Sequence, residues 1–454
     1  MNAVVSSLRA AELSCAAREV PSPLTGLRKT HHFDWREVLA ACWRHASIRG
    51  TSVLLGLMIA GGVALRIQRL AIPFEFTFDE QQYVDAAHHY LLRIPDLATC
   101  HPPLSKLLID VGILLFGNNP IGWRFMALCF GIQSVFLAYW VAGALFEDRR
   151  AGWFAAALVA ADGFFIAYSR CALPDGILTA FILWAMLAAV TARSWRGVLV
   201  SGVLVGAAAS MKWSGLMVGL PACLAVLLLR RVHWTSIASF AIVPVVHWAV
   251  WVLGLNMMGH PSDLASIVQV IQGFLTAHIG FPHGNPLSSS WYTWPLLYHP
   301  IVVKLSACGA KVRYASSIGN PLVWYVAELP LIGLPLIGTV AATRARWRAR
   351  WTAWFELRFT RALVIVVVGW VAMLLPWIAG PMRSFWYHYL PSWTFALLLF
   401  SGLIARLERR HPRWVFGFVL MVLGVAVFYA PVWGEFPLTT AQAHHRLLFV
   451  PWQP

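Results

Sequence analysis

Apolar runs close to the length of a membrane crossing recur along the chain, and short polar segments separate them. Because about 20 apolar residues are needed for a helix to cross a bilayer, these runs predict transmembrane helices. A further apolar stretch, 104–116, is shorter and predicts a helix in the membrane interface. We expect eleven spans, at approximately 52–70, 124–146, 151–168, 173–192, 197–211, 214–230, 236–255, 321–342, 361–380, 386–404 and 413–431.

The composition supports a membrane protein. Hydrophobic residues make up 59% of the 454 residues and charged residues only 12%, whereas a soluble domain carries about 25% charged residues. The formal net charge of +16 would suggest nucleic-acid binding in a soluble protein. Here the basic residues lie in short connections between apolar runs, so we predict a lipid bilayer, and no nucleic acid, as the partner. The expected fold class is an all-α polytopic membrane protein.

Arginines concentrate in every second connection between the predicted spans. Because Lys and Arg are enriched in short cytoplasmic loops, this alternation places the N-terminus in the cytoplasm and the C-terminus outside. We expect a cytoplasmic N-terminal segment at 1–50 and a transmembrane domain at 51–454, with long outer loops at 71–123 and 256–320. The basic connections hold Arg149, Arg150, Arg193, Arg196, Arg230, Arg231, Arg344, Arg346, Arg348, Arg350, Arg358, Arg361, Arg406, Arg409, Arg410 and Arg413.

Polar residues outside these connections gather on the outer side of the predicted spans. They come from distant parts of the chain, yet the predicted topology places them on one membrane face. Ionisable residues that converge on one face of a membrane protein are typical of a functional site. The set is Asp79, Glu80, Asp85, His101, Lys106, Arg124, Arg170, Asp175, Lys212, Arg383 and His388.

Two motifs lie in the first outer loop. Asp79 and Glu80 stand between aromatic residues in EFTFDEQQY, and such a pair suits a catalytic base with a partner, although a solvated loop has the same composition. In HPPLSK, the two prolines favour an extended turn before an apolar helix, and Lys106 lies one turn into that helix. A functional lysine and an ordinary turn at the start of a helix both fit this segment.

Cations and aromatic residues mark the outer ends of later spans. A single interfacial cation usually extends its charge towards water, but several on one face, here Arg124, Arg170 and Lys212, predict a phosphate site, and Arg383 joins the same face. Tryptophans and tyrosines there fit an ordinary aromatic belt as well as stacking on sugars. We predict acceptor or sugar contacts by His101, Lys106, Trp291, Tyr387 and His388.

Taken together, these segments resemble the protein O-mannosyltransferase family, membrane enzymes that use dolichyl- or polyprenyl-phosphate mannose. FTFDEQQY resembles the family's aromatic-Asp-Glu motif, and HPPLSK resembles its HPP-x-x-K segment. GWRF, YSRCALPDGIL and MKWSG resemble its middle spans, and SSSWYTWPLL, GNPLVWY and FWYHYLP its C-terminal half. The segments occur in family order across about residues 50–430.

The second outer loop is far too short for the β-trefoil (MIR) repeats of eukaryotic members, which favours a bacterial type. Pro174 before Asp175 and the Gln81-Gln82 pair also depart from the commonest family versions. The resemblance implies a GT-C glycosyltransferase fold, with Asp79 as the catalytic base, Glu80 helping to place the acceptor, and Arg124 in the donor site. Lys212 and Arg383 enter the donor site from the predicted topology alone.

We therefore expect mannose transfer, with inversion, from polyprenyl-phosphate mannose to Ser and Thr of secreted or membrane proteins. The reaction would occur on the periplasmic or extracellular side of the cell (inner) membrane. A phosphate leaving group needs no protonation, so one base and nearby cations suffice. No nucleotide, metal or other cofactor is expected, because no glycine-rich phosphate loop and no compact ligand set stands out. Two alternatives stay open: a related GT-C transferase that moves another sugar, such as aminoarabinose, to a lipid, and a transporter or flippase.

Overall fold

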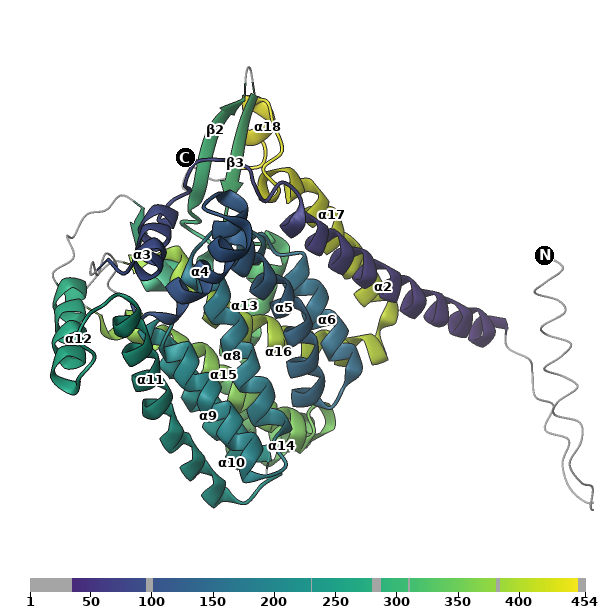
Figure 1. Cartoon of the computed structure of the whole chain (residues 1–454). Helices are drawn as coiled ribbons and strands as arrows, with labels where there is room; N and C mark the ends of the chain where they lie inside the picture. Colours follow the sequence, from purple (N-terminus) through teal and green to yellow (C-terminus); the bar gives the residue numbers. More distant parts are fainter. Residues whose placement is uncertain are drawn as a thin grey trace, which may run out of the picture. The chain divides into compact units, whose positions relative to one another are not determined.

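Long helices that run side by side form most of the computed structural model (Figure 1). The structure describes residues 35–94, 101–229, 231–279, 287–308, 311–380 and 384–447. The chain forms two units, 1–43 and 44–454, and only the start of helix α2 (Trp35–Ile67) is described in the first. The second unit holds the remaining elements.

The helices of this unit follow one another with short connections. They are α3 (Glu80–Leu92), α4 (Leu104–Phe116), α5 (Pro120–Phe146), α6 (Arg149–Ala160), α7 (Gly163–Tyr168), α8 (Pro174–Thr191), α9 (Trp195–Ala209), η1 (Trp213–Val218), α10 (Gly219–Leu229), η2 (Trp234–Ala241), α11 (Ile242–Met257), α12 (Leu264–Ile279), η3 (Trp291–Leu296), α13 (Pro321–Thr343), α14 (Ala345–Trp354), α15 (Leu357–Ala379), η4 (Trp386–Tyr389), α16 (Leu390–Arg410), α17 (Pro412–Trp433) and α18 (Thr440–His444).

Two small antiparallel sheets accompany the helices. The strands β1 (Ser288–Ser289) and β4 (Ser384–Phe385) pair with each other, and β2 (Val302–Cys308) pairs with β3 (Lys311–Ser316). The β1–β4 pair joins the second outer loop to the segment just before η4. None of these strands was predicted. β1 and β4 have two residues each, too few for a period-2 pattern, and β2 and β3 lie in a loop for which no secondary structure was expected.

Every predicted span contains a helix, but the helices differ in length. Within the described residues, eight helices are long and apolar enough to cross a membrane: Trp43–Ile67, Pro120–Phe146, Pro174–Thr191, Trp234–Met257, Pro321–Thr343, Leu357–Ala379, Trp386–Arg410 and Pro412–Trp433. The predicted spans 197–211 and 214–230 correspond to shorter apolar helices, and α12 was not predicted. The chain is a multi-pass membrane protein, and the count of eleven stays a prediction.

The predicted span 151–168 is two helices, because Asp162 interrupts it. The Asp162 carboxylate accepts hydrogen bonds from the backbone N–H groups of Phe164 and Phe165, at 3.0 and 3.3 Å, which begins helix α7. It also accepts one from the backbone N–H of Asn320, at 3.1 Å. A buried N-cap thus fixes the break and ties it to the start of α13.

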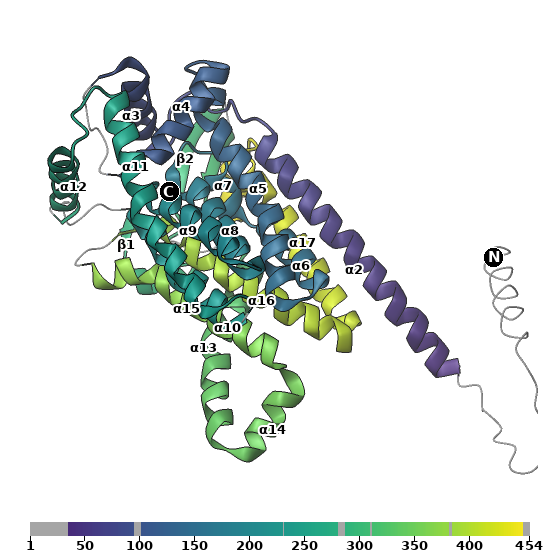
Figure 2. The ribbon, with the colours of Figure 1, turned by 60° about the horizontal axis from the view of Figure 1, so that its bottom comes forward.

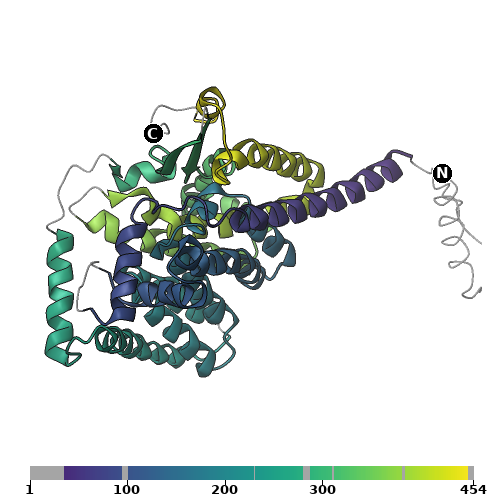
Figure 3. The same ribbon diagram turned by 45° about the horizontal axis from the view of Figure 1, so that its top comes forward.

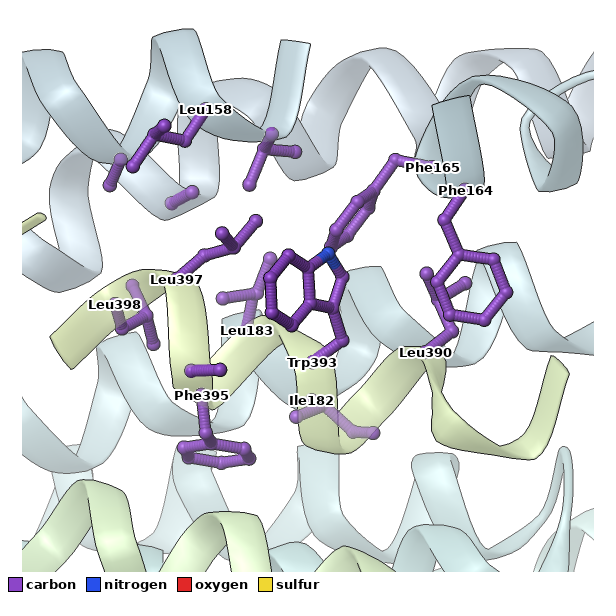
Figure 4. Close-up of a cluster of buried hydrophobic side chains, with 14 of the residues drawn as sticks. Leu158, Phe164, Phe165, Ile182, Leu183, Leu390, Trp393, Phe395, Leu397 and Leu398 are labelled. Atoms are coloured by element: carbon purple, nitrogen blue, oxygen red, sulfur yellow. The ribbon is translucent and has the colours of Figure 1, made fainter. Parts of the chain in front are cut away.

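Helix α16 forms the centre of the bundle. Of the most apolar stretch within Trp386–Arg410, 83% is buried inside the protein. Helix α16 packs against α6, α13, α15 and α17. Figure 4 shows Trp393 and Leu397 of α16 facing Leu158, Phe165 and Leu183 from the surrounding helices. In a bilayer, lipid tails are as apolar as these side chains, so close packing rather than exclusion of water favours this association.

Arg66 joins the end of α2 to the end of α6. Its fully buried guanidinium donates to the carbonyl oxygens of Gly62, Ala160 and Val159, each at 2.9 Å. These carbonyls lie near helix C-termini, where a cation also meets the negative end of the helix dipole. Arg66 therefore satisfies several backbone acceptors that would otherwise be buried without a partner.

The ends of several elements meet on one side of the bundle. α3 and α8 begin there, α9 and α15 end there, and η4 lies between α15 and α16. The same side carries α4 and the β2–β3 hairpin, in the upper part of Figure 1 and towards the viewer in Figure 3. Helix α14, between α13 and α15, lies at the opposite end (Figure 2).

We predict that Arg66→Met lowers the midpoint of thermal denaturation in detergent. Each buried carbonyl that loses its donor costs about 1–3 kcal/mol. The matched control is Arg49→Met, which removes an exposed arginine from the same helix and is expected to leave the midpoint unchanged. Equal midpoints for the two variants would contradict the capping role of Arg66.

Candidate active site

Three polar side chains from distant segments meet where α8, α9 and η4 come together. Lys212 Nζ donates to Asp175 Oδ1 at 2.9 Å, and it also lies 2.9 Å from His388 Nδ1. All three side chains are buried, at 2–7% exposure. Because an ammonium group only donates, His388 Nδ1 is the acceptor and the imidazole proton sits on Nε2. Asp175 and His388 thus hold the Lys212 charge in one position.

Aromatic rings line this cluster. The Trp377 and His388 rings stack with their centres 3.7 Å apart, and the Lys212 ammonium lies 4.9 Å from the centre of the Tyr387 ring. Trp294 meets the His388 ring edge-on, at 6.3 Å. These contacts hold the imidazole in its orientation and surround the lysine with a weakly polar wall, where its charge acts more strongly than in water.

Asp79 lies beside this cluster, and its carboxylate forms no hydrogen bond within the described part of the chain. It occupies the N-cap position of α3 but makes no side-chain cap hydrogen bond, and it is half-buried. Burial raises the pKa of Asp79, while the charge of Lys212 acts in the opposite direction and that of Asp175 raises the pKa further. Asp79 therefore combines a more basic carboxylate with free oxygen atoms, as a general base requires.

The residue before Asp79 has an unusual backbone conformation. Phe78 has a φ of 47°, in the left-handed region that a bulky L-residue rarely adopts. Its ring contacts the rings of Phe385 and Tyr387 edge-on, with centres 6.1 and 5.8 Å apart. These contacts hold the strained turn and direct Asp79 towards the segment that carries His388.

Glu80 has a different environment from its neighbour Asp79. Its fully buried carboxylate accepts two hydrogen bonds from Arg124, from Nε to Oε1 and from Nη2 to Oε2, both at 2.8 Å. The backbone N–H groups of Ala172 and Thr77 donate to Oε1 and Oε2, also at 2.8 Å. Both oxygens of Glu80 are occupied, so the carboxylate joins three segments of the chain.

Arg124 is saturated as well. Besides the two bonds to Glu80, it donates to the carbonyl oxygens of Leu70, Pro73 and Glu75, at 3.1, 2.8 and 3.1 Å. These bonds use all five N–H groups of the guanidinium. The predicted contact between Arg124 and a donor phosphate is untested, and the geometry favours a role in positioning the loop that leads to Asp79.

His101 and Lys106 lie around the turn that begins α4. Lys106 Nζ donates to the His101 carbonyl oxygen at 2.7 Å and lies 5.6 Å from the centre of the Tyr90 ring. The His101 ring stacks on Tyr83, at 5.9 Å. Tyr83 also lies near Tyr387, so this turn borders the cluster around Lys212. The two proposed substrate contacts are thus neighbours of the site and stay predictions.

The remaining residues predicted to contact the substrate are Arg383 and Trp291. Arg383 lies outside the described residues. Trp291 begins η3 and meets Tyr292, whereas Trp294 of the same helix is the ring that contacts His388. Asp175 was among the polar residues expected on the outer face but was not assigned a specific contact, and neither Trp294 nor Trp377 was predicted as a site residue. The position of Asp175 in the first turn of a helix at the predicted outer face was the available signal.

Within the described part of the chain, no three His, Cys, Asp or Glu side chains are placed to hold a metal ion. The described site instead offers one ammonium group, two carboxylates and an imidazole that donates through Nε2. This set can remove a proton from a neutral nucleophile at Asp79 and offer a positive charge to an anion near Lys212.

Comparison with known families gives two matches along the chain. Residues 100–260 match the family model described as dolichyl-phosphate-mannose-protein mannosyltransferase. Residues 264–452 match the C-terminal four TMM region of protein-O-mannosyltransferase. These matches confirm the resemblance found in the sequence.

Several curated proteins are similar over most of their length. The polyprenol-phosphate-mannose–protein mannosyltransferase of Mycolicibacterium smegmatis is 25% identical, with 80% of this chain and 84% of that protein covered. The protein of the same name from Mycobacterium tuberculosis is 24% identical, with 74% and 76% covered. Among solved structures, the Saccharomyces cerevisiae Pmt1–Pmt2 complex bound to the sugar donor gives a TM-score of 0.73. It is 12% identical and is matched over 89% of this chain and 93% of that chain, which confirms the expected GT-C fold.

We predict that Glu80→Gln lowers stability strongly and that Asp79→Asn does not. Glu80→Gln leaves Arg124 without its buried counter-charge and is expected to cost roughly 3–5 kcal/mol. Because the pKa of Asp79 is raised in the folded state, stability falls as the pH rises from the ordinary aspartate pKa through the raised one, and the ionised carboxylate costs stability above that range. Asp79→Asn is therefore expected to keep or raise the thermal midpoint at pH 7, and a large loss would contradict a free carboxylate.

Proposed function

The chain belongs to the protein O-mannosyltransferase family, and we propose that it transfers mannose from a polyprenyl-phosphate donor to Ser or Thr hydroxyls of proteins. The family matches and the mycobacterial relatives support the donor and the class of acceptor. The observation that carries the proposed mechanism is the unequal use of the acidic pair. Glu80 is fully hydrogen-bonded, whereas Asp79 lies near a buried ammonium group and its carboxylate has no hydrogen-bond partner among the residues that the structure describes.

In this mechanism Asp79 acts as the general base. It accepts the proton of the acceptor hydroxyl as the hydroxyl oxygen forms a bond to the anomeric carbon of mannose. The bond between that carbon and the phosphate oxygen breaks, and the phosphate keeps the electron pair. The phosphate is already a stable anion, so no acid is required to protonate it. A direct displacement by one nucleophile gives inversion at the anomeric carbon.

Lys212 is the described cation placed to act on the leaving phosphate. Asp175 and His388 take up two of its three N–H groups, which leaves the third for a ligand. Held in position before the reaction, the ammonium group stabilises developing negative charge without rearrangement. In the described cluster, the negative charges of Asp79 and Asp175 outweigh the single positive charge of Lys212. A further cation would therefore strengthen phosphate binding, and Arg383 is the candidate from the sequence.

Glu80 and Arg124 act as positioning residues in this scheme. Their bonds fix the backbone from Leu70 to Thr77, and this segment leads into Phe78 and Asp79. The base therefore sits at the end of a braced loop. Its orientation depends on a pair that makes no substrate contact in the proposal.

The proposed active site faces the periplasm or the exterior of an inner-membrane protein whose N-terminus is cytoplasmic. The site lies at the ends of α9 and α15, whereas the arginine-rich connection of α14 lies at the other ends of α13 and α15. Because arginine-rich short connections are enriched on the cytoplasmic side, this separation supports an outward-facing site.

We predict that Asp79→Asn abolishes transfer while the protein stays folded. With membranes that contain polyprenyl-phosphate mannose and a Ser/Thr acceptor peptide, loss of the base is expected to lower the rate roughly 10²–10⁴-fold. The parent rate should fall as the pH is lowered through the raised pKa of Asp79. Asp85→Asn, a half-buried aspartate on the same helix, is the matched control and should retain activity.

The products of this assay also separate the competing functions. Mannose on the peptide supports the proposal. Sugar found on a lipid acceptor supports a different GT-C transferase, and movement of the donor without any covalent product supports a flippase. Full activity of Asp79→Asn would remove Asp79 from the mechanism and leave the family membership intact.

We predict that the side of the protein that carries Asp79 faces outwards and that α14 faces the cytoplasm. Two cysteines introduced at exposed positions test this orientation, Gln81→Cys beside the site and Ala349→Cys in α14. In right-side-out cells, a membrane-impermeant maleimide should label the first and not the second, relative to the parent chain. Labelling of position 349 from outside would reverse the proposed topology.

A further inference from the structure

Helix α14 has the pattern of a helix that lies in a membrane interface. Trp347, Trp351 and Trp354 are spaced by four and three residues, so they share one face. At 100° per residue, Arg346 and Arg350 flank this face on one side and Arg344 and Arg348 on the other. Tryptophans between arginines on one face suit the boundary between lipid tails and head groups.

The charges of α14 are free to bind an anion. Residues 342–350 are all exposed, and within the described residues Arg344, Arg346, Arg348 and Arg350 form no ion pair. Some basic residues of neighbouring connections are paired instead, namely Arg409 with Asp148 and Arg231 with Glu147, both at 2.6 Å. The basic charge of α14 therefore has no carboxylate within the described protein to neutralise it.

A cavity of about 600 Å³ lies beside this helix, between α13, α14 and α15. Leu334, Leu363 and Val367 form its apolar walls, and Trp351 and Arg348 border it from α14. Arg348 Nη2 donates to the Ala342 carbonyl oxygen at 2.5 Å, and Trp351 Nε1 donates to Thr360 Oγ1 at 3.0 Å. These two bonds hold α14 over the cavity. Arg348, the charged residue of the cavity lining, therefore lies where the cavity meets the exposed arginines of α14.

We propose that this cavity binds an anionic glycerophospholipid, with an acyl chain between α13 and α15 and the head-group phosphate on the arginines of α14. The volume falls within the roughly 300–1,000 Å³ typical of ligand sites. The apolar walls lie in two helices long enough to cross the membrane, and exposed side chains such as Leu336 and Val364 open this region to surrounding lipid. Charge complementarity favours a head group with a net negative charge over a zwitterionic one, in which an ammonium group offsets the phosphate charge.

This site is separate from the proposed active site. It lies at the ends of α13 and α15 that are distant from Trp377 and His388, and none of its residues enters the proposed transfer reaction. A bound lipid would join α13 to α15 and fix α14 between them. The function of the site is therefore lipid-dependent stabilisation of the C-terminal spans.

The test uses the full chain in detergent, with phosphatidylglycerol and phosphatidylcholine of the same acyl chains as probes. Native mass spectrometry measures bound lipid, and thermal denaturation measures stabilisation. We expect the parent chain to bind phosphatidylglycerol more tightly than phosphatidylcholine. In the triple variant Arg346→Gln, Arg348→Gln, Arg350→Gln, affinity should fall on the order of 100-fold, since each arginine near an anionic head group contributes about five-fold.

Two further variants keep the test decisive. Val364→Trp fills the cavity without changing charge and should reduce binding of the same lipid. The control triple variant Arg193→Gln, Arg196→Gln, Arg413→Gln removes exposed arginines from other basic connections and should bind as the parent does. Without added lipid, Val364→Trp and the control triple variant should have the thermal midpoint of the parent. The α14 triple variant also loses the hydrogen bond from Arg348 to Ala342, so it is compared by the rise in its midpoint when lipid is added.

Several outcomes would overturn the proposal. The first two are equal affinity for phosphatidylglycerol and phosphatidylcholine, and an equal loss of phosphatidylglycerol affinity in the control triple variant. The next two are a full rise in the thermal midpoint with inorganic phosphate alone, and preferential binding of polyprenyl phosphate at this cavity. The last is shielding of α14 from solvent by a second copy of the chain. Unchanged phosphatidylglycerol binding in Val364→Trp would also overturn it, since the chain would then lie elsewhere.

Discussion

The buried pair of Glu80 and Arg124 is the interaction on which the arrangement of the site depends. Neither side chain reaches solvent, and all hydrogen-bonding capacity of the guanidinium and four acceptor positions of the carboxylate are used within the protein. Transfer of two charges out of water costs several kcal/mol per ion, and good geometry offsets this cost only when both partners are fully bonded. Satisfaction of both groups therefore requires one specific course of the loop between α2 and α3.

That requirement explains how residues distant in the chain form one site. The loop between α2 and α3 is bound through Glu80 to Ala172, just before α8, and α8 carries Asp175. Asp175 in turn holds Lys212, and Lys212 contacts His388 in the segment before α16. Each step is a buried polar contact at a helix end. In a bilayer, little water competes for these buried polar groups. A short series of such hydrogen bonds therefore fixes the relative positions of several helix ends on this side of the protein.

Much of this could be predicted from the sequence, and the failures have physical causes. Apolar periodicity located a helix at every expected span, but a single aspartate accepting N–H bonds split one run at Asp162. The adjacent carboxylates were predicted as a catalytic pair, and that role stays a prediction. No local pattern separates Asp79 from a fully bonded Glu80, because two of the bonding partners of Glu80, Arg124 and Ala172, lie 44 and 92 positions away. Likewise, Trp377 and Trp294 look like ordinary belt residues until the fold places them against His388.

The left-handed backbone at Phe78 has a consequence for how this protein can change. Residues in that region carry a conformational cost of order 1–3 kcal/mol, and glycine would remove it. The aromatic ring, however, is what contacts Phe385 and Tyr387 and keeps the neighbouring aspartate directed. With Asp79 as the proposed base, a substitution that relieves this backbone cost would loosen the ring contacts that orient it, so stability and turnover are in opposition at this position.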